Sequence, residues 1–283
     1  MGLKILVTGG AGFIGMNLIK RLVSEGHSVL SLDDYSTGTE ENHVEGAKYW
    51  EGDIETVEYI GGDYDLCYHI AAQSRVQPSF DDPTETFRVN VNGTRAVCDW
   101  AKNNNVKVIY AGSSSKHHDP SDSPYAMYKY LGEEVCKLYR KSYDLDVQIA
   151  RFYNVYGPGE SLDEKFGNVI GIWRSKSSKG ESLPIVGDGE QRRDFTHVDD
   201  IVDGLIRISQ TDKIHEDAWE LGSGRNYSVN ELFGFFQERF GVESTYIPEQ
   251  KGNYRETLNT NPDAERYLGW CPQDKLEEYI RTL

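Results

Sequence analysis

The stretch TGGAGFIG at residues 8–15 follows an apolar run at residues 3–7 and precedes a segment with helical periodicity. A strand that enters a tight glycine turn and continues as a helix brings backbone N–H groups and the positive end of the helix dipole to one point. Side chains at Gly9, Gly12 and Gly15 would obstruct a ligand there. The stretch therefore predicts a seat for the pyrophosphate of a dinucleotide, formed by Gly9, Gly12, Phe13, Ile14 and Gly15.

Short apolar runs rich in Val, Ile and Tyr alternate with helical stretches along the first half of the chain. They lie at residues 4–7, 28–32, 47–50, 66–70, 106–110 and 147–152. This alternation predicts an α/β fold with a doubly wound parallel sheet, helices on both faces and ligands at the carboxyl ends of the strands. Gly26 and residues 103–105 are expected to end two of the helices.

The sequence becomes more irregular after about residue 154, where prolines interrupt it repeatedly. A smaller α/β region for substrate binding is expected on the C-terminal side. We predict a nucleotide-binding domain at residues 1–165 plus about 191–222, and a second domain at about 166–190 plus 223–283. Within them, residues 194–208 are predicted as helix and residues 219–222 as a short strand.

Composition excludes several classes of partner. Acidic residues outnumber basic ones by 46 to 30, giving a net charge of −16, which argues against nucleic acid. The four cysteines, Cys67, Cys98, Cys136 and Cys271, form no CxxC pair, so neither a disulfide framework nor a zinc site is expected. With no basic and apolar leader and no apolar run near 20 residues, we expect a cytoplasmic protein without a membrane partner.

Acidic and small residues mark the ends of the predicted strands. Asp33 stands where a carboxylate binds the adenosine ribose and repels a 2′-phosphate, which favours NAD over NADP, although a solvated turn acid is the alternative. Asp53, next to Ile54, could contact the adenine amine of the cofactor or could be an ordinary turn residue, and the sequence favours neither alternative. Ala71 and Ala72 are small enough for a cofactor to pass closely, and would look the same as core residues.

Tyr125 and Lys129 lie four residues apart in a segment with helical periodicity, so both can share one face. A nearby ammonium lowers the pKa of a tyrosine, which makes Tyr125 a candidate general base. Ser113, after the fifth strand, is expected to hydrogen-bond the reacting oxygen, with Ser114 and Ser115 as competing candidates. Lys129 is also expected to hold the nicotinamide ribose. Tyr128 points away from this face of the helix and is expected to have only a packing role.

Together these residues resemble the extended short-chain dehydrogenases/reductases of the nucleotide-sugar epimerase and dehydratase family, and among them the UDP-glucose 4-epimerases. The resemblance implies a Rossmann domain and rests on motifs along nearly the whole chain. They are TGGAGFIG, DDYSTG at 33–38, HIAAQ at 69–73, NVNGT at 90–94, Ser113, Tyr125 with Lys129, RFYNVYGPG at 151–159, GDGEQRRDFTHV at 187–198, and residues 268–270.

The resemblance also implies a nucleotide-sugar site and an assembly. Asn154, Asn168 and Val169 would contact the substrate nucleotide and diphosphate. Arg193 would grip the diphosphate, unless it forms a surface ion pair with Asp194. His197 is expected to be structural, His117 and His118 lack a third metal ligand, and no metal is expected. A homodimer through the helix that carries Tyr125 is expected from the family.

The residues after Ser113 separate the reactions of this family. Family dehydratases place an acidic pair there and related decarboxylases a Glu, whereas this chain has Ser114 and Ser115. C4 epimerisation of a UDP-hexose then remains: Tyr125 takes the 4-hydroxyl proton, NAD accepts the hydride, and the 4-keto sugar turns over before reduction. NAD is not consumed.

Two departures from the family pattern keep other functions open. The segment between Ser113 and Tyr125 is shortened to a loop that contains SSKHHDPSDSP, and Gln250 stands where the family has a diphosphate-binding Arg, with Lys251 or Arg255 as possible replacements. One alternative is an epimerase/reductase that consumes reduced cofactor, against which Asp33 argues. Another is a non-catalytic NAD-sensing or interaction protein.

Overall fold

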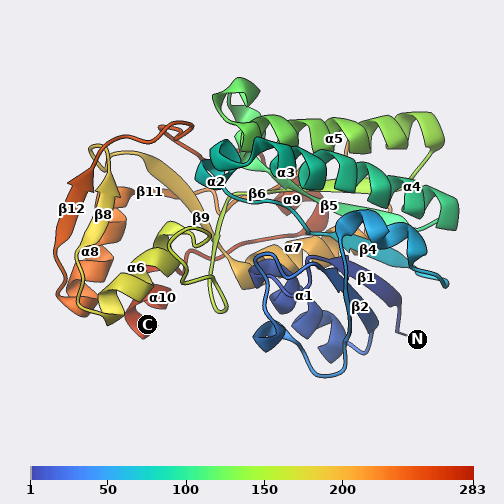
Figure 1. Ribbon diagram of the computed structural model, residues 1–283, viewed down its shortest axis with the longest axis horizontal. Helices are drawn as coiled ribbons and strands as arrows, with labels where there is room; N and C mark the ends of the chain where they lie inside the picture. Colours follow the sequence, from blue (N-terminus) through green and yellow to red (C-terminus); the bar gives the residue numbers. More distant parts are fainter. Residues whose placement is uncertain (1) are drawn as a thin grey trace.

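Seven parallel strands form the central sheet of the protein, in the order β10-β6-β5-β4-β1-β2-β3, in a computed structural model that describes residues 2–283 (Figure 1). This confirms the predicted doubly wound α/β fold. The strands are β1 (Lys4–Thr8), β2 (Ser28–Asp33), β3 (Lys48–Glu51), β4 (Leu66–His69), β5 (Lys107–Ser113), β6 (Val147–Phe152) and β10 (Trp219–Leu221).

Both faces of the sheet are covered because successive apolar side chains of each strand point to opposite faces. In β1, Leu6 packs into one core, whereas Ile5 and Val7 pack into the other. The first core lies under α4 (Thr94–Asn104) and α5 (Pro124–Tyr143), and the second under α1 (Phe13–Ser24) and α7 (Val198–Gln210).

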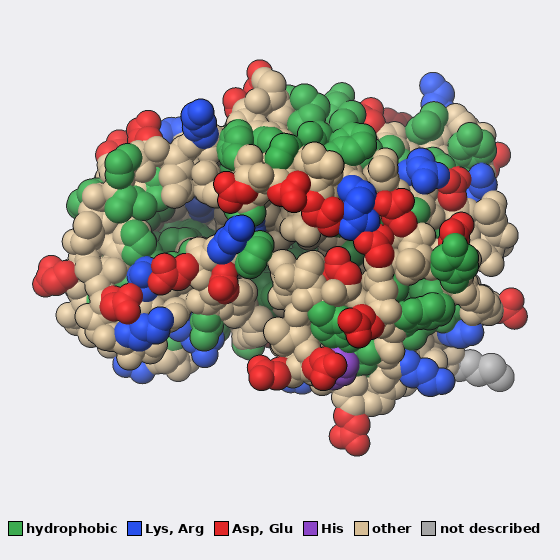
Figure 2. Space-filling model, viewed as in Figure 1, with side chains coloured by type: hydrophobic (Ala, Val, Ile, Leu, Met, Phe, Trp, Pro, Cys, Tyr) green, Lys and Arg blue, Asp and Glu red, His purple; other side chains and the backbone are tan. Residues whose placement is uncertain are grey.

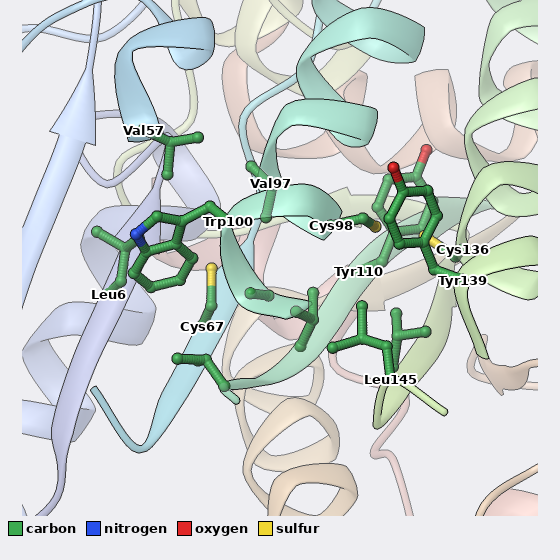
Figure 3. Packing of buried hydrophobic residues seen from close by; sticks show 14 of the residues in the cluster. Leu6, Val57, Cys67, Val97, Cys98, Trp100, Tyr110, Cys136, Tyr139 and Leu145 are labelled. Carbon is green, nitrogen blue, oxygen red and sulfur yellow. The ribbon is translucent and has the colours of Figure 1, made fainter. Parts of the chain in front are cut away.

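Trp100 belongs to the core under α4 and α5 (Figure 3). Its indole donates a hydrogen bond to Ile60 O at 2.9 Å. Cys67, Cys98 and Cys136 lie in this core, whereas Cys271 is exposed. All four cysteines are free thiols in the structure.

A smaller lobe lies at the left of Figure 1 and has its own core around Trp173 and Phe236. Its three-stranded sheet has the order β11-β9-β7, and a two-stranded sheet pairs β12 with β8. The elements are β7 (Asn154–Tyr156), β8 (Leu183–Val186), β9 (Arg192–His197), β11 (Asn226–Ser228), β12 (Ser244–Ile247), α6 (Val169–Ser178), α8 (Val229–Phe240) and α10 (Leu276–Thr282).

Two segments lie elsewhere than the sequence suggests. The helix prediction is wrong for residues 194–197, because these residues form the end of β9 and pair with β7 and β11, and α7 begins only at Val198. Near the C-terminus, α9 (Asp263–Leu268) and Trp270 return to the main sheet, where Trp270 Nε1 donates to Asp200 O at 2.7 Å. The exact domain boundaries stay a prediction.

Short helices connect the remaining elements and surround the carboxyl edge of the sheet. They are η1 (Glu40–Asn42), η2 (Ile54–Tyr59), α2 (Val76–Asp81), α3 (Pro83–Phe87), the π-helical turn η3 (Arg88–Gly93), η4 (Ser114–His117) and η5 (Pro120–Asp122). The strand order reverses between β1 and β4, which is where open parallel sheets bind ligands. Across residues 2–283, no helix has both the length and the apolar character that a membrane crossing requires.

Candidate active site

A cavity of about 430 Å³ lies at the carboxyl ends of β1, β2, β4, β5 and β6, where the two lobes meet. The face shown in Figure 2 is hollowed between the lobes. The cavity brings together most of the residues that the sequence analysis singled out. These are Gly9, Gly12, Phe13, Ile14, Gly15, Asp33, Ile54, Ala71, Ala72, Ser113, Tyr125, Lys129, Asn154, Asn168 and Arg193.

The glycine turn after β1 fits a pyrophosphate. Gly9 has φ +74°, and a Cβ there would lie 2.7 Å from Ala71 N. A Cβ on Gly15 would lie 2.1 Å from Gly9 O, so only glycine allows α1 to start this close to the strand. No side chain caps the N-terminus of α1, and its first turn carries no acidic residue. The helix amides and dipole are therefore available to an anion.

Asp33 ends β2 at the wall of the cavity and is 8% exposed. Its carboxylate accepts hydrogen bonds from Ala11 N at 2.8 Å and Tyr35 N at 2.9 Å. Burial raises the pKa of Asp33, and these two backbone bonds oppose the rise. A carboxylate fixed in this way suits the hydroxyls of an NAD ribose and disfavours a 2′-phosphate.

Asp53 does not line the cavity. Its side chain caps η2 by accepting from Glu55 N at 2.8 Å, and it pairs with Arg88 at 2.6 Å. The structure therefore uses Asp53 as a turn and cap residue, while Ile54 reaches the cavity.

Ser113, Tyr125 and Lys129, the predicted catalytic residues, meet at one end of the cavity. Ser113 is the last residue of β5, and the other two lie on α5. Tyr125 OH donates to Ser113 Oγ at 3.2 Å, and Lys129 Nζ donates to Ala111 O. Tyr128 instead packs edge-on against Phe87.

The electrostatics of Tyr125 differ from the expectation based on Lys129. Burial raises the pKa of Tyr125, and its hydrogen bond with Ser113 and the charge of Arg75 oppose this rise. Arg75, not Lys129, is thus the cation that lowers the pKa of the phenol in this structure. Lys129 is 4% exposed, and burial lowers its own pKa to about 8.

Ser115 supports Ser113. It is 4% exposed, and both its Oγ, at 3.0 Å, and its backbone N, at 3.2 Å, donate to Ser113 Oγ. Ser114 and Ser115 line the cavity where a dehydratase would have its acidic pair. Among the lining residues of the described chain, the only carboxylates are Asp33 and Asp34, at the adenosine end.

The substrate side of the cavity contains only part of the predicted set. Asn168 caps α6 by accepting from Gly171 N at 2.7 Å, whereas Val169 lies outside the lining. Arg255 is exposed and pairs with Asp188 at 2.8 Å, away from the cavity. Gln250 and Lys251 also lie outside the lining, although residues 252–254 belong to it.

Arg193 does not form the alternative ion pair with Asp194. Asp194 is fully buried and accepts hydrogen bonds from Ser223 N, Gly224 N and Asn259 N. Arg193 lines the cavity, and burial lowers its pKa to about 10.

Buried charges anchor the shortened loop and the end of β6. Arg151, 1% exposed, pairs with Glu133 at 2.7 Å and Glu220 at 2.8 Å. His117, in η4, bonds Glu220 at 2.9 Å, as does Tyr153 OH at 3.0 Å. His118 stacks on Tyr254. Within residues 2–283, no three His, Cys, Asp or Glu side chains are grouped to hold a metal.

The sequence analysis missed Arg75. It follows HIAAQ by two residues and lines the cavity beside Tyr125. A cation just beyond a predicted strand end is the only local signal, and nothing in the sequence shows that the small lobe covers it.

Comparisons with known proteins agree with this geometry. The model of the NAD dependent epimerase/dehydratase family matches residues 5–222. A UDP-glucose 4-epimerase from Mycolicibacterium smegmatis is 33% identical, over 98% of this chain and 96% of the relative.

Two solved structures share the fold over nearly their full length. A UDP-glucose 4-epimerase from Thermotoga maritima, solved with UDP-glucose, has a TM-score of 0.91 and 30% identity over 99% of this chain and 96% of that one. A UDP-glucuronic acid 4-epimerase from Bacillus cereus, solved with UDP-glucuronic acid and NAD, has a TM-score of 0.90 and 25% identity over 98% of this chain and 96% of that one.

Proposed function

The chain belongs to the NAD dependent epimerase/dehydratase family, and we propose that it interconverts the C4 epimers of a UDP-hexose with NAD as its resident cofactor. One observation carries the choice of reaction. The contact between Tyr125 and Ser113 is intact, while the positions after Ser113 provide only the hydroxyls of Ser114 and Ser115. Hydroxyls do not ionise near neutral pH, so water elimination lacks its acid and base.

The residues at the catalytic end divide the work as follows. NAD, held by the glycine turn at Gly9, Gly12 and Gly15 and by Asp33, would supply reversible hydride transfer at C4. Tyr125, acting as the phenolate, takes the proton of the 4-hydroxyl, and the phenol formed in this way gives the proton back to the product oxygen. Ser113 donates to that oxygen, because its own Oγ already accepts bonds from Ser115. Lys129 keeps N–H groups for the ribose of the cofactor beyond its bond to Ala111 O.

Incubation of the purified protein with UDP-glucose, UDP-galactose and their N-acetyl forms tests this proposal. We expect interconversion of at least one pair, and we expect Tyr125→Phe to abolish it while NAD remains bound. If no nucleotide sugar is interconverted, the proposal is wrong. Net oxidation of added NADPH by a keto sugar would instead support the epimerase/reductase alternative.

We also propose a homodimer through the outer face of α5. Met127, Leu131 and Leu138 share this face, and Leu138 is 54% exposed. Hydrophobic side chains gather over α5 at the top of Figure 2. An apolar stripe on a long helix suits packing against the same helix of a second copy.

The compartment we propose is the cytoplasm. Four free cysteines, three of them in the core, suit a reducing environment. Fractionation of the source cells with an antibody to the protein tests this, and recovery from an oxidising compartment would contradict it.

A further inference from the structure

Two guanidinium groups reach the cavity from opposite lobes. Arg75 stands at the N-terminal end of α2, beside the main sheet, and Arg193 lies on β9 of the small lobe. Neither forms an ion pair with a carboxylate of residues 2–283. The chain as a whole has a net charge of −16, so two cations that face one cavity from opposite sides without a carboxylate partner indicate an anionic ligand.

One hydrogen bond holds the Arg75 side chain in place, but its other donor groups lack hydrogen-bond partners. Its Nε donates to Phe166 O at 2.7 Å, and its terminal N–H groups have no partner within residues 2–283. Burial lowers its pKa, and the nearby Tyr125 hydroxyl and Glu160 carboxylate, which act in the opposite direction, do not offset this effect. Arg193 is similar, because its Nη1 donates only to the neighbouring Arg192 O, at 2.9 Å.

The wall around Arg75 is formed together with the segment that follows Gln250. Gln77 Nε2 donates to Lys251 O at 2.7 Å, and a Cβ on Gly252 would lie 2.8 Å from a methyl of Val76. Residues 252–254 of this segment line the cavity. The segment itself sends no cation there, since Lys251 does not line the cavity and Arg255 is paired with Asp188.

We propose that Arg75 is the second arm of a diphosphate clamp, opposite Arg193. This rests on the proposed nucleotide-sugar substrate, whose diphosphate carries one negative charge on each phosphate. Two planar guanidinium forks can bind these oxygens in pairs, and no lining carboxylate lies on the substrate side to compete. Arg75 also lies close enough to Tyr125 to lower its pKa, so the clamp fixes the substrate next to the catalytic hydroxyl.

Calorimetric binding of UDP and of uridine, both with saturating NAD, tests the clamp in the wild type and in Arg75→Gln. Gln keeps an amide donor for Phe166 O. We expect Arg75→Gln to weaken UDP binding at least tenfold, the value of a charge-assisted hydrogen bond, and to leave uridine binding within twofold. Arg193→Gln should behave alike, and Arg75→Lys should fall between, because it keeps the charge without the fork.

Arg21→Gln is the matched control, since Arg21 is exposed on α1 and pairs with Glu25. Unchanged UDP affinity in Arg75→Gln overturns the clamp. This holds even if the variant binds a UDP-hexuronate more weakly, because that loss would report a contact of Arg75 with the sugar and not with the diphosphate. Equal weakening of UDP and uridine also overturns it, because the effect is then structural. If the wild type binds UDP tightly but epimerises nothing, the proposed function fails and the clamp stands. If it binds no UDP, both fail.

Discussion

Ser113 is defined by the hydrogen bonds that it accepts. Its Oγ accepts from Tyr125 OH, Ser115 Oγ and Ser115 N, at 3.0 to 3.2 Å. These three donors share the two lone pairs of the oxygen, so its own hydrogen is free to point into the cavity. Ser115 thus acts through Ser113, as a positioning residue.

Ser115→Ala should lower kcat about fivefold and leave KM nearly unchanged, because the lost bond of about 1 kcal/mol orients Ser113 and does not touch the ground-state substrate. Steady-state kinetics on the epimerised substrate measures both constants. A rise in KM with unchanged kcat would show that Ser115 binds substrate directly.

The positions of candidate site residues could be predicted from the sequence where a local pattern marks them. Glycine spacing, the acid Asp33 after a strand, and a Tyr and Lys four apart are such patterns, and the structure brings their residues into one cavity, whereas Asp53 after the third strand lies outside it. Arg75 and Arg255 lack such a pattern. Their roles depend on which distant group they meet, Phe166 O for the first and Asp188 for the second.

Helices and strands could likewise be predicted where a local pattern marks them, and not where they depend on distant pairing. Most strands of the main sheet contain short apolar runs, and β6 and β10 lie within the predicted ranges. β9 could not be recognised, because its short run enters α7 without a break and pairs with strands about 30 to 40 residues away. β5 extends three residues beyond the predicted range at its carboxyl end, because Gly112 and Ser113 interrupt the apolar run although they are buried in the strand.

The loop that replaces the longer family segment is fastened by the bond between His117 and Glu220. Glu220 raises the pKa of His117 above its usual 6.5, so the stability from this pair is complete below that pH and is lost as the pH rises through the folded-state pKa. Glu220 has a pKa below its usual 4.5, so its contribution is present above that pH and is lost on acidification.

His117→Asn should therefore lower the melting temperature by about 1–2 °C at pH 6 and by less at pH 9. The effect is small because His117 is half-exposed and Arg151 still pairs with Glu220. Differential scanning calorimetry at both pH values measures the difference. A penalty that grows toward pH 9 would contradict the assigned direction.

At the scale of the whole molecule, the outer face of α5 leads to an expected mass in solution. The wild type should have twice the 32.1 kDa chain mass by light scattering, and Leu138→Glu should be monomeric, because the charge would be buried at the centre of the interface. Lys20→Glu, on an exposed position of α1, is the comparison variant. A monomeric wild type would contradict the proposed dimer.

The cavity where the two lobes meet places a hydroxyl-proton acceptor next to a cofactor seat, so the central claim concerns the hydrogen at C4. Proton NMR of wild-type protein incubated with UDP-glucose in D₂O follows that hydrogen directly. The account predicts UDP-galactose with protium retained at C4, because the hydrogen leaves and returns without meeting solvent. UDP-galactose with deuterium at C4, or bound nucleotide sugar that never epimerises, would contradict it.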